Sequence, residues 1–365
     1  MDEKIRRLAR WVEGKKGMPF SIELSPTLRC NLNCLFCWRY GKKVDYGDEL
    51  ILEEYRRILK EASQLKVKEI RIIGGGEPML RKDTLEVMKE VKKYGMFGYI
   101  CTNGALFSED VIKTLVEIGW DHVKISLHGP NRKMQNLLAQ GESFEKVVKN
   151  IKIFVKWKKK LKTQKPKIEI GLVLNSLNFR EIVPMVKMAK KLNVQAFFIE
   201  PITMYTEKGE ELKLKKEEAE EFKEIVKRAY PLADGLETNL QQFFSPELIE
   251  KTGKMTEKIK KNIKSGKKNF LSIPCFEPWW RMGIRVDGWV CPCGFLDQDT
   301  TENVREKSLR EIWFGKYFER RRNQLLQKDM PEYCQKCCTT LVQYNQIIRR
   351  ALKTHILNAK IMTEI

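Results

Sequence analysis

Three cysteines fall close together near the start of the chain, in "RCNLNCLFCW", residues 29–38. Cys30, Cys34 and Cys37 follow a C-x3-C-x2-C spacing with no histidine among them. Three thiolates are one ligand short of a closed tetrahedral zinc site, and also one short of a fully ligated iron–sulfur cube. The spacing therefore predicts that a fourth ligand comes from elsewhere in the chain, or that one metal position is left open.

A glycine-rich turn follows the second predicted strand. The sequence "GGGEP", residues 74–78, sets three glycines before Glu77 and a proline that fixes the turn. Glycines let a ligand lie against bare backbone. We interpret the three-thiol loop as a cluster site whose open position is filled by a small molecule with an amino and a carboxylate group. The glycine backbone would bond that amino group, and Phe36 would shield an aromatic ring of the ligand.

A second group of cysteines gathers toward the other end of the chain. Its members are Cys275, Cys291, Cys293, Cys334, Cys337 and Cys338. Cys101 stands alone within a predicted strand, and we interpret it as a buried apolar thiol. The chain shows no secretory signal at its start, so a disulfide framework is not expected. Metal or cluster binding is the better interpretation, and tetrahedral zinc in the second group is the competing one.

The order of apolar runs predicts the scaffold that positions these residues. β-Branched runs bounded by Gly, Pro or Asn predict strands at 20–27, 68–75, 98–104, 122–129, 168–175 and 194–202. Segments of helical period lie between them at 52–65, 82–95, 108–119 and 180–193. This alternation predicts an α/β fold with a parallel sheet and helices outside. Six such units are too few for a closed eight-stranded barrel, so we expect a partial, open (β/α)6 barrel.

The rest of the chain has a different character. Residues 206–272 are predicted to form a helical, Lys-rich connector. The segment that follows contains the second cysteine group and a hairpin with Asp287-Gly288 at its turn, which predicts a small domain stapled by a cluster. The predicted domains are an N-terminal helical extension at 1–19, the barrel at 20–205, the connector at 206–272, the small domain at 273–345 and a C-terminal helix at 346–365.

The cysteine loop with its central aromatic Phe36, followed by "GGGEP" on the next strand, resembles the radical S-adenosylmethionine (radical SAM) enzymes. The resemblance covers most of the chain and implies the partial barrel for residues 20–202. It also implies the family's chemistry: a [4Fe–4S] cluster cleaves S-adenosylmethionine reductively to methionine and a 5′-deoxyadenosyl radical, which abstracts hydrogen from a substrate. The cofactors carry the hard step, and the protein supplies binding, orientation and exclusion of water.

The resemblance assigns roles position by position. It makes the ligands of the first cluster Cys30, Cys34 and Cys37. Phe36 would lie beside adenine, and the backbone of Gly75 and Gly76, together with Glu77, would meet the methionine amino group. Three residues at later strand ends would lie near the same ligand, or would serve only as turn residues: Asn103, Ser126 and Asn175.

The second cysteine group resembles the SPASM and Twitch auxiliary-cluster domains of the same superfamily. The likeness lies in Cys275, the Asp-Gly hairpin, "CPC" and the final C-x2-C. Because the group has fewer cysteines than a full SPASM domain, one auxiliary [4Fe–4S] cluster of the Twitch form is favoured, giving two clusters in all. Its implied ligands are Cys275, Cys293, Cys334 and Cys337, with Cys291 and Cys338 surplus. A structural zinc site remains the alternative.

Two further polar residues lie at predicted strand ends. His128 would face the active site as an acid, base or hydrogen-bond partner, and its alternative role is that of a satisfied strand-end histidine. Glu200 would point toward the same mouth and bind a polar substrate, or form a salt bridge at the rim. Trp279 and Trp280 are interpreted as core of the small domain.

The sequence leaves several functions open. A radical SAM enzyme acting on a peptide or protein is our first hypothesis, with the auxiliary cluster as an electron conduit and ferredoxin or flavodoxin as electron donor. RNA, lipid or a small metabolite such as a tetrapyrrole is the alternative substrate. A non-catalytic zinc or iron–sulfur binding protein is the third hypothesis, and the open three-thiol loop argues against it.

The charge of the chain is strongly basic. There are 69 Lys and Arg residues against 48 Asp and Glu, a net charge of +21. Lysines concentrate at 156–167 and 254–269. Solvated helix faces explain this pattern best, while attraction to RNA or an anionic surface is the sharper alternative. No run of apolar residues is long enough to cross a membrane, and we expect a cytoplasmic protein.

Overall fold

The computed structural model describes residues 2–45, 47–202, 206–244, 270–293, 299–329, 334 and 344–355. The chain divides into two compact units, and both are discontinuous in sequence. Unit 1 consists of Met1–Ser25, Asp48–Arg71 and Lys251–Ile365; unit 2 consists of Pro26–Gly47 and Ile72–Glu250. The domain boundaries expected from the sequence remain predictions. Among the described residues, no helix is both long and apolar enough to cross a membrane.

Unit 2 is built from alternating strands and helices. Its strands are β3 (Phe97–Thr102), β4 (His122–Ser126), β5 (Lys167–Leu174), β6 (Ala196–Pro201) and β7 (Glu237–Thr238). Its main helices are α3 (Thr84–Lys93), α4 (Glu109–Glu117), α5 (Arg132–Ala139), α6 (Phe144–Lys160), α7 (Ile182–Lys191), α8 (Glu207–Glu211) and α9 (Lys216–Ala229). The strands are parallel neighbours in the order β7-β6-β5-β4-β3.

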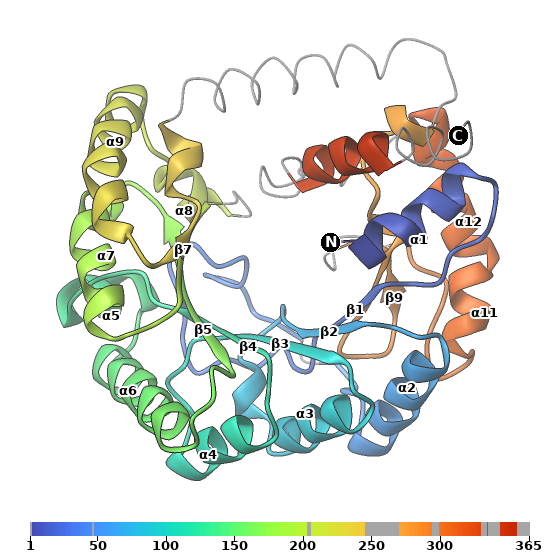
Figure 1. Ribbon diagram of the computed structural model, residues 1–365, viewed down its shortest axis with the longest axis horizontal. Coiled ribbons are helices and arrows are strands. Elements are labelled where there is room, and N and C mark those ends of the chain that lie inside the picture. Colours follow the sequence, from blue (N-terminus) through green and yellow to red (C-terminus); the bar gives the residue numbers. More distant parts are fainter. Residues whose placement is uncertain are drawn as a thin grey trace. The chain divides into compact units, whose positions relative to one another are not determined.

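The two faces of this parallel sheet differ in chemistry. Ile125 on β4 lies beside Ile170 on β5 in the register, and both are fully buried. The Ile125 side chain lies near Gly104, as does Val147 of α6, so this face packs against the helices. Figure 1 shows α4, α6 and α7 along one side of strands β3 to β6. Because side chains alternate along a strand, Lys124 and Ser126 occupy the face that these helices do not cover.

The described part of the predicted connector, residues 206–244, is not a separate element. It forms α8, α9, the short helix η3 (Tyr230–Ala233), β7 and the short helix η4 (Leu240–Phe243), all in unit 2. β7 extends the parallel sheet beyond β6, through the pairs Ala196 with Glu237 and Phe197 with Thr238. Sequence patterns do not predict β7, because a two-residue strand is too short to show alternation. The second Lys-rich stretch, at 254–269, lies outside the described residues.

Unit 1 gathers elements from both ends of the chain. Its elements are α1 (Asp2–Val12), β1 (Ser21–Leu24), α2 (Leu52–Gln64), β2 (Glu69–Ile72, its last residue in unit 2), β8 (Arg281–Ile284), β9 (Val290–Cys291), α11 (Leu309–Phe314) and α12 (Lys316–Gln327). β1 pairs parallel with β8, and β8 pairs antiparallel with β9. Gly288, with φ +83°, forms the turn between β8 and β9, so the predicted hairpin is confirmed.

The core of unit 1 joins α1 to the far end of the chain. Ile5 and Leu8 of α1 pack in one buried cluster with Ile348 and Leu352, which belong to a helical segment at 344–355. Trp279 and Trp280 lie in the same cluster, which confirms their interpretation as core residues. Deep burial of these large rings supplies much of the hydrophobic stabilisation of this small core.

Two helices of unit 2 are followed by a glycine. Gly95 and Gly119 follow α3 and α4 with φ near +65°, the left-handed geometry expected after a helix. Asp83 occupies the N-cap position of α3, but its side chain makes no capping bond there. Its carboxylate instead accepts hydrogen bonds from Arg81 at 2.9 and 2.6 Å. The Asp83 carboxylate therefore binds a guanidinium rather than capping α3.

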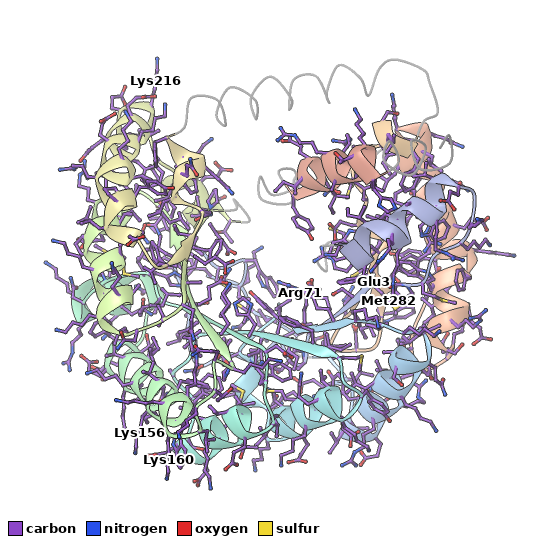
Figure 2. All side chains as sticks on the ribbon, viewed as in Figure 1. Glu3, Arg71, Lys156, Lys160, Lys216 and Met282 are labelled. Atoms are coloured by element: carbon purple, nitrogen blue, oxygen red, sulfur yellow. The ribbon has the colours of Figure 1, made fainter. Side chains whose placement is uncertain are left out.

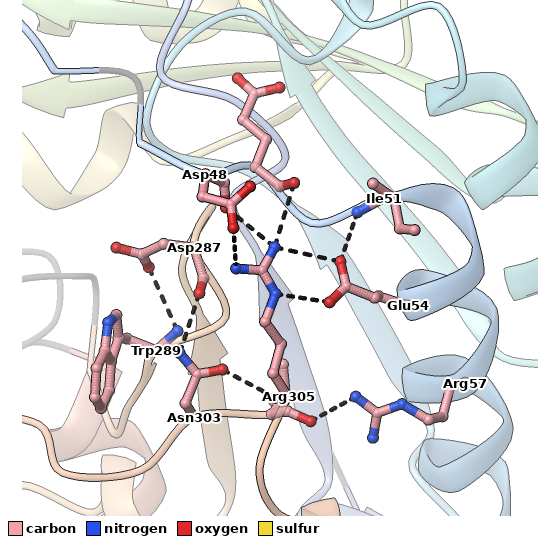
Figure 3. Close-up of polar contacts among 10 residues, drawn as sticks. Asp48, Ile51, Glu54, Arg57, Asp287, Trp289, Asn303 and Arg305 are labelled. Carbon is pink, nitrogen blue, oxygen red and sulfur yellow. Dashed lines mark hydrogen bonds and ion pairs between the residues drawn. The ribbon is translucent and has the colours of Figure 1, made fainter.

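An arginine ties two segments of unit 1 together (Figure 3). Arg305 forms ion pairs with Asp48 and Glu54, both at 2.7 Å. Glu54 also accepts a hydrogen bond from the backbone N–H of Ile51 at the start of α2. The arginine side chain is 29% exposed, so the network is only partly screened by water.

Replacement of Arg305 by alanine is expected to lower the free energy of unfolding by about 1 kcal/mol, the upper range for partly exposed ion pairs. Urea unfolding would measure the change, and the loss should shrink in high salt, which screens these charges. Arg56→Ala, which removes an exposed pair with Glu53 on the same helix, is the matched control and should change little. Equal losses in the two variants would contradict a role for the Arg305 network.

Candidate functional site

The three cysteines of the first group lie on one loop of unit 2, residues 26–47. All three are free thiols and partly buried. Burial raises the pKa of Cys34 to about 12, and the neighbouring Cys37 and Cys30 thiols add to the shift. The mutual influence of the three groups places them close together. The structure therefore places the three predicted ligands on one loop, and their binding of a cluster remains a prediction.

Backbone hydrogen bonds give this loop a fixed shape. The N–H of Cys37 donates to the carbonyl of Cys34 at 3.0 Å, which closes a tight turn around Phe36. The N–H of Leu35 donates to the carbonyl of Leu138 at the end of α5, also at 3.0 Å. Leu35 and Leu138 then pack together in a small buried cluster. The thiols thus stand on a loop that is anchored to a helix by both polar and apolar contacts.

The GGGEP turn docks against the chain just before Cys30. The N–H of Gly76 donates to the carbonyl of Thr27 at 2.7 Å, and that of Glu77 donates to the carbonyl of Arg29 at 2.8 Å. A Cβ on Gly76 would lie 1.9 Å from the Arg29 carbonyl oxygen. The absence of a side chain at Gly76 is therefore what lets the turn reach the cysteine loop. Gly75 has φ +67°, a conformation that also favours glycine.

The carboxylate of Glu77 is buried and turned toward the end of β3. It accepts hydrogen bonds from the Thr102 hydroxyl at 2.6 Å, the Asn103 N–H at 2.7 Å and the Met79 N–H at 3.0 Å. Burial raises the pKa of Glu77, and these three hydrogen bonds oppose the rise. Both carboxylate oxygens thus accept hydrogen bonds from other residues of the chain. Contact between Glu77 and a bound amino group remains a prediction.

Glu77→Gln is expected to lower the free energy of unfolding by about 2 kcal/mol at neutral pH. The amide would turn an NH2 group toward a backbone N–H, and a buried donor left without an acceptor costs about 1–3 kcal/mol. Denaturant unfolding would measure the loss. Glu86→Gln, on the half-exposed side of α3, is the control and should unfold like the wild type.

Glu77→Gln also tests how the free energy of unfolding depends on pH. Because the pKa of Glu77 is raised in the folded state, the folded chain holds this proton more tightly than the unfolded chain does. The stability that this group contributes is thus full below the ordinary glutamate pKa and is lost as pH rises through the raised value. Glu77→Gln should lack this slope, and an unchanged slope would contradict the assignment.

Two of the residues predicted to contact the bound small molecule form hydrogen bonds with neighbouring parts of the chain. The side-chain N–H of Asn103 donates to Asn31, directly after Cys30, at 2.8 Å, and its side-chain oxygen accepts from the Ala105 N–H. Asn175 is fully buried and bonds only within its own turn, accepting from Leu177 and donating to Val173. Asn103 therefore lies beside the cysteine loop, whereas Asn175 has the contacts of a turn residue.

His128 packs beside the central aromatic of the loop. The rings of Phe36 and His128 meet edge to face, with centroids 4.7 Å apart. Nδ1 of His128 accepts a hydrogen bond from the Val173 N–H at 3.1 Å, which places the ring hydrogen on Nε2. Burial and the nearby Lys124 lower the pKa of His128 to about 3, so the ring is neutral. A neutral, oriented ring suits a hydrogen-bond partner or a satisfied strand-end histidine, and it does not suit an acid.

A charged group that sequence reasoning missed lies on the same face as Ser126. The Lys124 side chain crosses over Gly171 on β5, where a Cβ would lie 2.3 Å from the lysine Cε. It forms an ion pair with Glu200 on β6 and lies 3.7 Å from Glu169. Glu200 therefore forms the salt bridge that was its alternative role. The alternation of His122, Lys124 and Ser126 along β4 could have placed Lys124 on the same face as Ser126.

Ser126 lies next to the lone cysteine of the chain's third strand. The Cys101 thiol is 4.0 Å from the Ser126 hydroxyl oxygen. Burial raises the pKa of Cys101 to about 11, so this thiol is protonated at neutral pH. The Cys101 side chain is partly buried, and its interpretation as a packing thiol rests on its contact with Ser126. Whatever Ser126 binds would lie close to the Lys124 pair and to Cys101.

The second cysteine group is partly described, and its described members lie in unit 1. The Cys275 sulfur accepts a hydrogen bond from the Glu277 N–H at 3.4 Å. Burial is the largest cause of the raised pKa of Cys275, and Cys334 contributes to it, so these two thiols are near one another. Cys291 is fully buried, with its thiol directed to the Gly283 carbonyl. Cys337 and Cys338 lie outside the described residues.

The donor chemistry of both groups fits iron–sulfur clusters. Each group offers several thiols and no histidine or carboxylate among the predicted ligands, and thiolates are the usual ligands of such clusters. Within the described residues, no three His, Cys, Asp or Glu side chains are gathered as they would be around one metal ion.

Residues 24–164 match the model of the Radical SAM superfamily, and residues 275–338 match the SPASM iron–sulfur cluster-binding domain. The chain contains a radical SAM domain and a SPASM-type iron–sulfur domain. The first match contains the cysteine loop and the GGGEP turn, and the second begins at Cys275 and ends at Cys338. The resemblance drawn from the two cysteine groups is therefore confirmed, together with the expectation of an enzyme family that uses iron–sulfur clusters and S-adenosylmethionine.

Two curated relatives illustrate the range of this superfamily. A probable GTP 3′,8-cyclase of Thermococcus kodakarensis is 32% identical over 176 residues, 48% of this chain and 55% of that protein. The chain thus spans about half the length of this relative. An AdoMet-dependent heme synthase of Methanosarcina barkeri is 24% identical over 301 residues, 81% of this chain and 82% of that protein.

The fold is shared with a solved radical SAM protein. SuiB of Streptococcus suis, crystallised with S-adenosylmethionine, superposes with a TM-score of 0.64 at 17% identity and covers 92% of this chain and 75% of SuiB. SuiB has also been crystallised with its precursor peptide SuiA. This likeness confirms the predicted α/β class with a partial barrel and a small iron–sulfur domain.

Proposed function

We propose that Cys30, Cys34 and Cys37 hold a [4Fe–4S] cluster and that S-adenosylmethionine fills its open position. The observation that carries this proposal is the docking of the GGGEP turn against the chain just before Cys30, through Gly76 and Glu77. When bound, these cofactors supply a 5′-deoxyadenosyl radical that takes a hydrogen atom from the substrate. The remaining work falls to the side chains around them.

The chain's own residues would bind and orient S-adenosylmethionine. Phe36, whose ring meets the neutral His128 edge to face, would lie beside the adenine ring. The carbonyl oxygens around Gly75 and Gly76 suit the methionine amino group, since an ammonium is a donor and needs acceptors. Asn103 and Ser126 remain proposed contacts to the ribose or the methionine carboxylate. Asn175 is the weakest of these proposals because its turn already uses its side chain.

We further propose an auxiliary [4Fe–4S] cluster in unit 1, with Cys275, Cys293, Cys334 and Cys337 as ligands. The nearness of Cys275 to both Cys334 and Cys293 supports this choice for the described members. With four protein ligands the cluster would have no open iron, so it would move electrons rather than bind substrate. Ferredoxin or flavodoxin would be the external electron donor.

A peptide or protein is the substrate class that we propose. Support comes from the shared fold with SuiB, which has been solved with a bound precursor peptide. A tetrapyrrole is the second candidate, because the match to the heme synthase extends over 81% of this chain.

Binding to RNA or to an anionic surface is supported only by the basic charge of the chain. Figure 2 shows Lys156 and Lys160 on the outward side of α6, where Lys156 pairs with Glu109 at 3.1 Å. A cytoplasmic location remains a prediction.

One experiment tests the proposal as a whole. The chain would be purified without oxygen and reconstituted, and its iron, sulfide and zinc would be counted. S-adenosylmethionine and dithionite would then be added and 5′-deoxyadenosine measured. We expect about eight irons per chain, the content of two [4Fe–4S] clusters, with 5′-deoxyadenosine formed. Zinc in place of half the iron would overturn the auxiliary cluster, and iron without bound S-adenosylmethionine would overturn the open cluster site.

A further inference from the structure

A buried arginine stands at the start of β8 in unit 1. Arg281 is 9% exposed and forms two ion pairs, one to Glu23 on β1 at 2.7 Å and one to Glu277 at 2.6 Å. Glu277 is fully buried and Glu23 is 3% exposed. A buried charge trio of this kind adds little net stability, because desolvation of the charges offsets their attraction. Fold stability alone therefore gives no reason for its presence.

The register of the hairpin sets this arginine opposite a cysteine. β8 and β9 pair antiparallel, with Gly283 opposite Cys291. β9 ends at Cys291, and the same register continued two residues beyond it would set Arg281 opposite Cys293. Directly opposed side chains lie about 5 Å apart at Cβ. Cys293 and Cys275 both act electrostatically on the Arg281 guanidinium. Two independent observations thus place the arginine beside two proposed cluster ligands.

The glutamate partners connect the arginine to the same ligands. The backbone N–H of Glu277 donates to the Cys275 sulfur, while its carboxylate binds Nε of Arg281. Further out, the Lys4 ammonium lies 3.7 Å from the centre of the Trp280 ring and donates to the Tyr344 hydroxyl. Arg281 therefore acts electrostatically on both thiols, while Arg349 also acts on Cys275. Glu277 is the anion bonded to the Cys275 sulfur through its backbone.

We propose that Arg281, held between Glu23 and Glu277, sets the reduction potential of the auxiliary cluster in unit 1. The inference rests on the auxiliary cluster of the proposed function. Reduction adds one electron to the [4Fe–4S]2+ state and gives [4Fe–4S]+. A fixed positive charge in a buried, low-dielectric site favours the state with the extra electron, and a fixed negative charge disfavours it. Arg281 thus raises the midpoint potential, and Glu277 lowers it.

The test is a redox titration of the full-length chain in which only the auxiliary cluster can form. Cys30→Ala/Cys34→Ala/Cys37→Ala removes the first cluster site. In this background the reconstituted protein is titrated with dithionite, and electron paramagnetic resonance follows the [4Fe–4S]+ signal. The variants are Arg281→Gln, Arg281→Lys and Glu277→Gln. Arg285→Gln is the matched control, because Arg285 follows β8 on the same hairpin, donates its backbone N–H to the Trp289 carbonyl and pairs with Asp287.

Opposite shifts are the expected result. Arg281→Gln should lower the midpoint potential and Glu277→Gln should raise it, while Arg281→Lys and Arg285→Gln should stay near the background value. A purely structural role would not reverse the direction of the shift between the two partners. Should Arg281→Gln fail to fold, Glu277→Gln and Glu23→Gln still test the sign, since both remove a negative charge.

Two results would overturn the inference. Iron-loaded variants that share one midpoint potential would remove the role of Arg281 and leave the auxiliary cluster standing. Zinc instead of iron in the background protein would remove the auxiliary cluster as well. Iron counts therefore separate a failure of this inference from a failure of the proposed function.

Discussion

Cys34→Ala is expected to abolish formation of 5′-deoxyadenosine, with a fall of more than about 100-fold. Loss of an outer-shell partner alone costs a metal site about 10- to 100-fold, and a lost ligand costs more. Cys34 is the central thiol of the loop, and hydrogen bonds to α5 hold its neighbours in place. The anchored loop cannot bring another thiol into the vacated position. The assay is 5′-deoxyadenosine formed per chain under dithionite, together with the iron content.

Cys101→Ala is the matched control for this substitution. Its thiol belongs to β3 and contacts Ser126 rather than the loop. We expect Cys101→Ala to keep the iron content of the wild type, whereas Cys34→Ala should lose the share that belongs to the first cluster. Wild-type iron and full product formation in Cys34→Ala would refute the assignment of the first cluster site.

Gly76→Ala is the second change with a large expected effect. The added Cβ would stand 1.9 Å from the carbonyl oxygen of Arg29, and backbone on both sides leaves no flexible atom to give way. The turn would have to withdraw and break the hydrogen bonds to Thr27 and Arg29. Overpacking costs about 1–3 kcal/mol, and each lost bond about 1 kcal/mol more. We expect a loss of about 3 kcal/mol or more in the free energy of unfolding.

Binding of S-adenosylmethionine should fall with the same variant. The turn carries the backbone groups proposed to meet the methionine amino group, so its withdrawal removes them. Equilibrium dialysis with labelled S-adenosylmethionine would measure the affinity. Gly95→Ala is the control: it has a left-handed backbone, φ +67°, but open space around its Cα, so only a modest backbone penalty of about 1 kcal/mol is expected. Unaltered binding by Gly76→Ala would refute the role of the close approach.

The six strands of the predicted barrel were accessible from sequence because each is a short apolar run with clear boundaries. The run at 168–175, for example, is β5, Lys167–Leu174. The three-thiol loop could also be predicted from the sequence, because its proposed ligands all lie within residues 30–37. Local patterns are strongest where the chemistry itself is local.

Contacts between the ends of different strands could not be predicted from the sequence in this way. The sequence suggests a ligand for Glu77, but the structure directs its carboxylate to Thr102 and Asn103, some 25 residues further along the chain. The path of Lys124 over Gly171 likewise depends on the register of β4 with β5. Register is a property of paired strands, and no single stretch of sequence contains it. The same limit applies to Arg281 opposite Cys293.

The packing of α1 has a consequence for biosynthesis. The Lys4 ammonium bonds to Tyr344, 340 residues later, and Ile5 and Leu8 pack against the helical segment at 344–355. A ribosome adds about 5–20 residues per second, so the apolar face of α1 waits on the order of half a minute for its partner. Unit 2 can fold during that interval, whereas the core of unit 1 closes only after residue 352 has been synthesised. The apolar face of α1 is thus buried long after it is made, and chaperones can bind it until then.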